Sequence, residues 1–301
     1  MFDKILICSD GSQSALLAAR AGARIAQQFH SAVVLVHSYD PAVVAYPAFG
    51  GGGWEFAAGQ DSLDAAAEES RRDMIQHTGR IFEEAGVKYE TLLECGHPVE
   101  AITRVAMQQK ADLVVLGGRG LSDMAALLLG SVSEGVLHRA HCPVLIVRGD
   151  QAAQQAPEWR EILLASDGSE GAGQAAVFAI GIAQKFAASL RVLNVLDGSS
   201  LPYSLSPYLA ADSETPHSRS EQLLATITAE VSKEAGAAGV PRTFHQETGD
   251  PADIICGFTD RLNLGLIVIG CRGRGTLTSL LLGSVSNSVA HRSHRSVLVT
   301  R

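Results

Sequence analysis

The sequence predicts an α/β protein made of two tandem, doubly wound, five-stranded parallel-sheet domains of Rossmann-like type. Three observations lead to this prediction. The chain of 301 residues repeats itself once, short apolar runs alternate with longer segments of helical period, and several apolar runs contain almost no polar residue. Alternating strands and helices imply right-handed crossovers, which place helices on both faces of the sheet.

The repeat covers nearly the whole chain at two constant offsets. Residues 5–12, ILICSDGS, match residues 162–169, ILLASDGS, at an offset of 157, since 162 − 5 = 157. Gly96-His-Pro matches Gly249-Asp-Pro at an offset of 153, since 249 − 96 = 153, and this offset holds to the last strand. A period of about 150 residues is the size of a complete domain with its own core. We therefore expect domains at residues 1–149 and 158–301.

The strands of the first copy can be predicted from their apolar runs. Residues 4–9, 112–117 and 144–148 are nearly continuous apolar stretches, which are typical of strands buried on both faces of a parallel sheet. Residues 32–38 and 87–94 are the two remaining strands. The first copy therefore has five strands, separated by segments long enough for helical crossovers.

The segments between these runs show the helical spacing of apolar residues. They predict helices at 13–29, 63–85, 98–109 and 131–139. The second copy repeats the pattern, with matching helices between strands at 161–166, 189–196, 242–247, 264–270 and 297–301. After the second strand of each copy, at 40–61 and 197–220, the chain is rich in Pro, Gly and Ser. Such stretches are typical either of a lid over a ligand or of a disordered surface loop.

The last strand of each copy, at 144–148 and 297–301, is apolar and would be an exposed sheet edge. Proteins cover such edges to avoid uncontrolled pairing. We expect these two strands to pair antiparallel with each other across an internal pseudo-twofold axis.

Composition indicates a soluble protein of the cytoplasm. The chain is 46% hydrophobic and 19% charged, and its start, MFDKI, enters a strand pattern without a basic and apolar leader. No apolar run reaches the roughly 18 residues that a membrane span needs. The net charge of −8 argues against nucleic acid as the main partner, because nucleic acid binding depends on Lys and Arg that neutralise phosphates. The cysteines are odd in number and not closely paired, which predicts reduced, mostly buried thiols at Cys8, Cys95, Cys142, Cys256 and Cys271.

The strongest functional signal is a glycine and serine pattern present once in each copy. Residues 117–133, GGRGLSDMAALLLGSVS, return as residues 270–286, GCRGRGTLTSLLLGSVS. In both, Gly-x-x-Gly ends a strand and Gly-Ser-Val-Ser opens a helix. Glycine lets a ligand approach the backbone, and the amides of a helix N-terminus bind phosphate oxygens, aided here by serine hydroxyls. The alternative is that the glycines turn the chain and that Ser131 and Ser284 cap the helices.

An aspartate follows the first strand of each copy, in the sequence Ser-Asp-Gly-Ser. Ligands of open parallel sheets bind beyond the carboxyl ends of the strands, where the strand order reverses. Asp10 should therefore face the loop at Gly117, and Asp167 the loop at Gly270. Each carboxylate is a candidate for binding adenosine hydroxyls or a metal on the phosphates. The alternative is that it belongs to an ordinary helix cap.

These residues resemble those of the universal stress protein family, specifically its ATP-binding branch, along almost the whole of both copies. The resemblance implies an adenine nucleotide alpha-hydrolase-like fold and a nucleotide ligand, ATP or else ADP or AMP, with Mg as a candidate companion. In the first copy it implies a site formed by Asp10, Ser38, Leu116, Gly117, Arg119, Gly120, Gly130, Ser131, Val132 and Ser133. In the second copy it implies Asp167, Val195, Ile269, Gly270, Arg272, Gly273, Gly283, Ser284, Val285 and Ser286. Asp10 and the backbone near Ser38 would hold adenosine, and the others would surround ribose and phosphates.

The family resemblance also implies a role as sensor or regulator in the stress response, and a homodimer of tandem chains, without naming a protein partner. A slow ATPase or an adenylating enzyme of the same superfamily is the alternative, and a scaffold without nucleotide is a third. No lysine follows the glycine loop, so the pattern is not a Walker loop. Relatives often have proline where this chain has Cys8 and Ala165, and histidine where it has Arg119 and Arg272.

Two histidine pairs, His138 with His141 and His291 with His294, have a spacing that zinc sites use. No third ligand lies nearby in the sequence. We interpret them instead as cations favoured at a helix C-terminus. His97 and Asp250, which precede prolines, are expected to begin helices.

Overall fold

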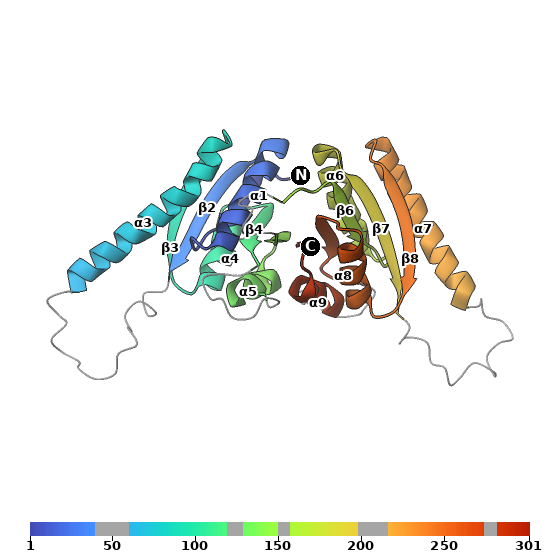
Figure 1. The fold of residues 1–301 in the computed structure, drawn as a ribbon. Coiled ribbons are helices and arrows are strands. Elements are labelled where there is room, and N and C mark those ends of the chain that lie inside the picture. The colour runs from blue at the N-terminus through green and yellow to red at the C-terminus, as the bar shows by residue number, and fades with distance from the viewer. Residues whose placement is uncertain (40–59, 119–128, 150–156, 198–215, 274–281) are drawn as a thin grey trace, which may run out of the picture.

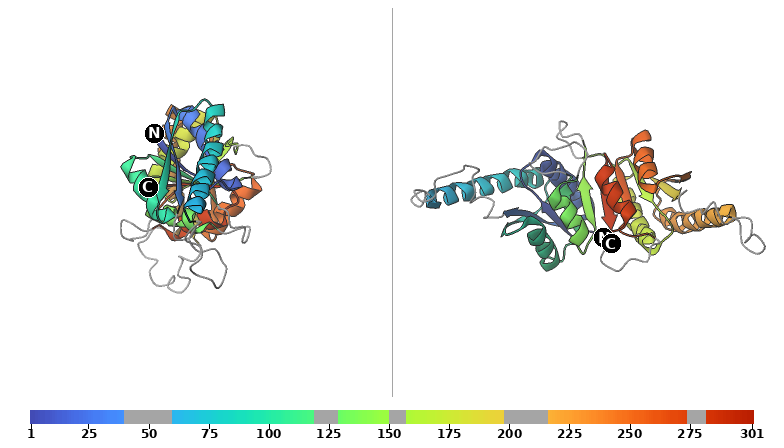
Figure 2. Two further views of the ribbon diagram at one scale, coloured as in Figure 1. Left: turned by 90° about the vertical axis from the view of Figure 1, so that its left-hand side faces the viewer. Right: turned by 90° about the horizontal axis from the view of Figure 1, so that it is seen from below.

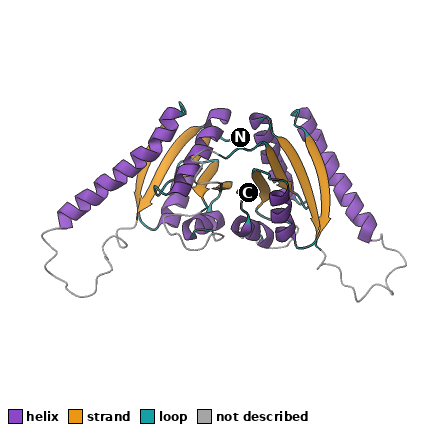
Figure 3. Cartoon of the chain, viewed as in Figure 1, coloured by secondary structure: helices purple, strands orange, loops and turns teal. Residues whose placement is uncertain are grey.

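The computed structural model describes residues 1–39, 60–118, 129–149, 157–197, 216–273 and 282–301. In this part of the chain, two similar α/β halves lie side by side, with both termini near their junction (Figure 1). Strands form the middle layer and helices cover it on both faces (Figure 3). Among the described residues, no helix combines the length and the apolar composition that crossing a bilayer requires.

The elements of both halves follow the predicted order. The first half contains β1 Lys4–Cys8, α1 Gln13–Phe29, β2 Ala32–Tyr39, α3 Gln60–Glu84, β3 Tyr89–Cys95, α4 Pro98–Gln108, β4 Leu113–Gly117, α5 Ser131–Arg139 and β5 Val144–Val147. The second half contains β6 Glu161–Ala165, α6 Glu170–Phe186, β7 Ser189–Leu196, α7 Pro216–Ala237, β8 Arg242–Thr248, α8 Pro251–Arg261, β9 Leu266–Gly270, α9 Ser284–Arg292 and β10 Ser296–Thr300. Helices α3 and α7 begin inside the stretches expected to be irregular, most of which lie outside the described residues.

All these strands belong to one ten-stranded sheet in the order β3-β2-β1-β4-β5-β10-β9-β6-β7-β8. Neighbours within each half are parallel, whereas β5 and β10 pair antiparallel, with Leu145 opposite Leu298. The predicted pairing of the two last strands is therefore confirmed. In each half the strand order reverses beside the first strand, since β1 lies between β2 and β4, and β6 lies between β7 and β9.

Side chains at the start of the helices explain where several of them begin. Ser12 and Ser169 are the N-caps of α1 and α6, and each hydroxyl oxygen accepts a hydrogen bond from a first-turn amide. Gly11, which precedes Ser12, has a φ of +76°, a conformation that glycine adopts without strain. His97 and Asp250 are the N-caps of α4 and α8, as expected from the prolines after them.

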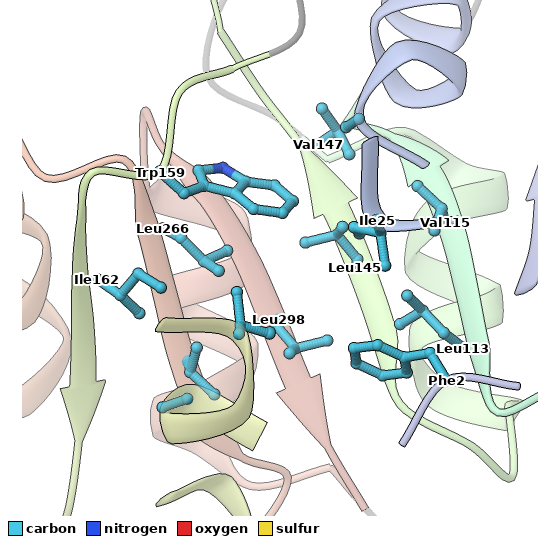
Figure 4. Close-up of a cluster of buried hydrophobic side chains, with 14 of the residues drawn as sticks. Phe2, Ile25, Leu113, Val115, Leu145, Val147, Trp159, Ile162, Leu266 and Leu298 are labelled. Atoms are coloured by element: carbon cyan, nitrogen blue, oxygen red, sulfur yellow. The ribbon is translucent and has the colours of Figure 1, made fainter. Parts of the chain in front are cut away.

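Apolar side chains of both halves pack into shared clusters, one on each face of the sheet. Figure 4 shows Phe2 and Leu145 of the first half close to Leu298 and Trp159 of the second. The rings of Phe2 and Phe178 stack with centroids 5.6 Å apart. We expected a core for each copy, but the core continues across the junction. Fully burying one large apolar side chain contributes about 1.5 to 3 kcal/mol, so this junction holds the halves together as one unit.

The cysteines are free thiols, as predicted, but they are less buried than expected. Cys8 and Cys271 are buried, Cys142 and Cys256 are half-buried, and Cys95 is exposed. The prediction is therefore wrong for Cys95. Burial raises the pKa of Cys142 and of Cys256 to about 11 and also raises that of Cys8, so these thiols stay protonated at neutral pH.

Candidate functional site

The predicted site of each copy gathers at the carboxyl edge of the sheet, beside the reversal of strand order. The turn after β1 meets the end of β4 there, because Gly117 lies against the first turn of α1. A Cβ atom at position 117 would lie 2.7 Å from the carbonyl oxygen of Ser14, and one at Gly270 would lie 2.6 Å from that of Gly171. We expected these glycines to admit a ligand. The structure gives a different reason for them, since they let a strand end approach the backbone of a helix.

Each glycine loop is closed at its base by one backbone hydrogen bond. The amide of Gly130 donates to the carbonyl of Gly118 at 2.9 Å, and the amide of Gly283 donates to that of Cys271 at 2.7 Å. Arg119 and Gly120, two predicted site residues, lie outside the described residues. The loop therefore leaves the sheet and returns to the helix at nearly the same point in both copies.

Asp167 faces the second glycine loop, as expected. A Cβ atom at Gly273 would lie only 2.4 Å from Oδ2 of Asp167, while Oδ1 of this carboxylate accepts the amide of Ser169 at 3.0 Å. Asp10 accepts the amide of Ser12 in the same way, at 3.0 Å. One oxygen of each aspartate thus holds the turn into the helix.

The helices α5 and α9 begin at glycines that provide no side-chain cap. Gly130 and Gly283 are the N-caps, with φ and ψ of −66° and 147°, and of −67° and 150°. Ser131 and Ser284 are therefore the first helical residues and are exposed, so the alternative that they cap the helices is wrong. First-turn amides have no acceptor within their own helix and carry partial positive charge. Each of these two N-termini can receive an anion.

The second serine of each motif points inward. The hydroxyl of Ser133 is buried and donates to the carbonyl of Gly117 at 2.8 Å. The hydroxyl of Ser286 lies 3.1 Å from the carbonyl of Cys271 and 3.0 Å from that of Gly283. We expected these hydroxyls to donate to phosphate, but in this structure their protons hold the helix to the base of the loop.

The apolar members of the predicted site belong to the core. Leu116 and Ile269 are buried in the cluster that spans both halves, and Val132 and Val285 pack against it half-buried. Their side chains therefore contribute to the core at the edge of the proposed site.

The end of the second strand differs between the copies, where Ser38 and Val195 are both half-buried. Beside them, Nδ1 of His37 donates to the carbonyl of Ser9 at 2.8 Å, and Nδ2 of Asn194 donates to that of Ser166 at 2.9 Å. Burial lowers the pKa of His37, against the opposing effects of the Ser9 carbonyl and the charge of Asp10. Neither residue was predicted from the sequence to belong to the site, although the offset of 157 matches the two (194 − 37 = 157).

Helix α3 adds polar contacts beside the first copy's site. The hydroxyls of Thr78 and Ser9 are 2.9 Å apart, and the guanidinium of Arg71 lies 4.1 Å from the ring centroid of Tyr39. Arg71 also pairs with Glu68 at 3.1 Å. At the offsets of the repeat, the second copy has apolar residues in place of Tyr39, Arg71 and Thr78, namely Leu196, Leu224 and Val231.

Comparison with known proteins identifies the family of this architecture. The model of the universal stress protein family matches residues 1–148 and again residues 158–301. The chain belongs to the universal stress protein family. It is 30% identical to a universal stress protein of Mycolicibacterium smegmatis over 301 residues, covering 99% of this chain and 96% of the relative. A Thermus aquaticus universal stress protein is 38% identical over 148 residues, which is 49% of this chain and 100% of that relative.

A crystal structure of an Archaeoglobus fulgidus universal stress protein has the same fold as this tandem universal stress protein. The TM-score is 0.68 at 24% identity, over 99% of this chain and 96% of that one. The family resemblance stated from the sequence is thus confirmed along both copies.

The histidine pairs of this family member lie at the ends of α5 and α9. His138 and His291 occupy the last helical turns, and His141 and His294 follow the helices. Within the described ranges, no group of three or more His, Cys, Asp or Glu side chains could hold a metal ion.

Proposed function

We propose that each copy binds an adenine nucleotide, ATP or else ADP or AMP, at the carboxyl edge of the sheet, and that the protein acts as a sensor or regulator in the stress response. The observation that carries this proposal is the pair of uncapped helix N-termini at Gly130 and Gly283. Each lies beside a loop whose base is closed by a backbone hydrogen bond, and in the second copy Asp167 faces that loop. Anions bind such N-termini through oriented amides.

In the first copy, different residues would contact different parts of the nucleotide. The amides of Ser131, Val132 and Ser133, with the hydroxyl of Ser131, would hold phosphate oxygens. Asp10 would hold adenosine or a Mg ion on the phosphates, which suits an ion that usually takes one or two carboxylates together with substrate phosphates. The backbone near Ser38 would meet the base. Asp167, Ser284 and Val195 have the same roles in the second copy, where Arg272 adds a cation.

Nucleotide binding would act by stabilising one arrangement of the two glycine loops, as in any regulator that a ligand controls. The same proposal includes a location in the cytoplasm and a homodimer of tandem chains. Light scattering with and without ATP tests the dimer, and a mass of one chain under both conditions contradicts it.

Mass spectrometry of the small molecules released by denaturing the purified protein tests the main proposal. We expect ATP, ADP or AMP. Protein stripped of ligand should then bind ATP in a calorimetric titration, and it should release no ADP over hours if it is a regulator and not a slow ATPase. Finding no adenine nucleotide, and no heat on adding ATP with Mg, would contradict the proposal.

A further inference from the structure

Arg148 reaches from the end of the first copy to a helix of the second. Its guanidinium donates to backbone carbonyls at the C-terminal end of α9: Nη2 to Ala290 at 2.7 Å, and Nη1 to His291 at 3.3 Å and to Ser293. The hydroxyl of Ser296 bonds both the amide and the carbonyl of Arg148, at 3.1 and 3.0 Å. A cation at this position satisfies carbonyls that have no partner within the helix and opposes the negative end of the helix dipole.

The Cγ and Nε atoms of the same side chain lie beside Gly118, at the base of the first glycine loop. A Cβ atom at Gly118 would lie 2.9 Å from Nε of Arg148 and 3.1 Å from its Cγ. Gly118 is also the residue whose carbonyl closes that loop by accepting the amide of Gly130. Arg148 therefore touches the base of the first site and the C-terminus of α9 at once.

Helix α9 continues this connection to the second site. It has nine residues, which at about 1.5 Å per residue make a short rigid rod. Its N-terminus, at Gly283 and Ser284, is the proposed anion site of the second copy. A shift of its C-terminal end thus moves the amides that would hold the second ligand. Helices α5 and α9 lie next to each other at the centre of the molecule in two views (Figures 1 and 2).

The reverse connection is present across the pseudo-twofold axis. Arg301 is the counterpart of Arg148, since 301 − 148 = 153, and its guanidinium donates to the carbonyl of Leu137 in α5. Leu137 is the counterpart of Ala290, since 290 − 137 = 153. Cys271, the counterpart of Gly118, lies beside the end of β10, because its amide donates to the carbonyl of Thr300, the residue before Arg301, at 2.8 Å. Also across the axis, Oε1 of Glu134 in α5 lies 3.5 Å from Nε2 of His291 in α9.

We propose that Arg148 and Arg301 are positioning residues that couple the two sites, each linking one glycine loop to the phosphate-binding helix of the other copy. The identity of the ligand rests on the proposed function, whereas the mechanical link does not. The link through Arg148 is the stronger of the two, because this side chain holds several carbonyls of α9 and lies directly on the loop base.

Hydrogen exchange of the whole chain without nucleotide tests the link itself. Arg148→Met should raise exchange of the amides in α9 by about tenfold, the effect of losing a charged hydrogen-bond donor, and should leave α5 unchanged. Arg301→Met should loosen α5 and leave α9 unchanged. Arg148→Lys keeps the charge but lacks the planar guanidinium, so it should restore part of the protection of α9. This variant also provides a test if Arg148→Met folds poorly. Unchanged exchange in α9, or equal loosening of both helices, overturns the proposal.

A second hydrogen-exchange experiment adds ATP to protein whose second site is blocked by Gly283→Val. ATP at the first site should slow exchange of α9 in this variant but not in Gly283→Val combined with Arg148→Met. Equal protection in both variants overturns the coupling. If the wild-type protein binds no ATP and Arg148→Met still loosens α9 alone, the proposed function fails while the positioning role of Arg148 is supported.

Discussion

The two copies agree closely where phosphate would bind and differ where the rest of the ligand would lie. Loop closure, helix start and the inward serine are the same at Gly130 and Gly283. At the end of the second strand, however, the first copy has His37 and the α3 side chains of Arg71 and Thr78. The second copy has Asn194 there, with apolar residues at the positions that match Arg71 and Thr78. The shared contacts come from backbone groups and from serines present in both copies, whereas the different ones come from side chains that differ between the copies. Under the proposed function, one shared backbone arrangement would hold phosphate in two sites of unequal selectivity.

A second difference concerns charge in the first turn of α5 and of its counterpart α9. The first copy has Glu134 there, with Oε1 3.5 Å from Nε2 of His291 of the second copy, whereas the second copy has Asn287. A carboxylate at this position favours the helix but repels a bound phosphate. We therefore expect the second site to bind polyphosphates more tightly than the first.

The largest expected effect tests whether the strand-end glycines are alike. Gly117→Ala and Gly270→Ala should each lower the free energy of unfolding by about 3 kcal/mol, because the new methyl group would meet helix backbone that cannot move aside. Gly257→Ala is the matched control, since its Cβ would meet nothing within 4 Å, and it should be neutral or slightly stabilising. Urea unfolding measures all three. A loss of stability from only one of these two substitutions would show that the two sites are built differently.

The next effect separates the two serines of one motif. Ser133→Ala should cost about 1 to 2 kcal/mol of stability, because it takes a donor from a carbonyl at the base of the loop, with little direct effect on nucleotide affinity. Ser131→Ala should do the reverse and weaken ATP binding while leaving stability within about 0.5 kcal/mol of wild type. Thermal unfolding and calorimetry on the same samples compare them. Equal effects of both substitutions on affinity would mean that the inward hydroxyl turns outward when ligand binds.

The comparison of His37 with Asn194 predicts a pH dependence confined to the first copy. The pKa of His37 is lowered in the fold, so the folded state favours the neutral ring. Its contribution to stability is then present above about pH 6.5, the ordinary value, and is lost as pH falls through and below it. His37→Asn keeps a donor for the Ser9 carbonyl, as Asn194 does for Ser166. The melting temperature of the variant should therefore fall less than that of wild type between pH 7.5 and pH 5.5. An identical fall in both proteins would contradict the assignment of this pH dependence to His37.

The smallest expected effect concerns Glu134. Glu134→Asn, which copies the second site, should strengthen ATP binding at the first site by about two- to fivefold at low salt, the range of a charge near a helix end. The gain should shrink as salt is added, because salt screens exposed charges. Asn287→Glu is the reciprocal control and should weaken the second site. Calorimetry at two salt concentrations measures both, and an unchanged affinity would mean that the first-turn carboxylate does not face the ligand.

Much of this fold could be predicted from sequence because apolar periodicity reports burial directly. The continuous run 144–148 even predicted its antiparallel partner, since an apolar edge must be covered. The structural requirement for glycine at position 117 could not be predicted, because it depends on the close approach of the Ser14 backbone in α1. His37 and Arg148 were missed for a related reason. Both bond to backbone carbonyls, which any residue provides, and the partner Ala290 is 142 positions from Arg148.

The number of nucleotides bound per chain tests the central claim that both copies are working sites. Gly130 has an extended backbone that any residue adopts, so Gly130→Val should fold normally while placing a branched side chain in front of the phosphate amides. Gly283→Val does the same in the second copy, where the new Cβ atom would lie 3.1 Å from the carbonyl oxygen of Cys271, so circular dichroism must first show that this variant folds. Calorimetric titration of protein stripped of ligand should give two ATP per wild-type chain and one for either variant. One ATP per wild-type chain, unchanged in Gly130→Val or in Gly283→Val, would show that one copy has kept the fold and lost the site.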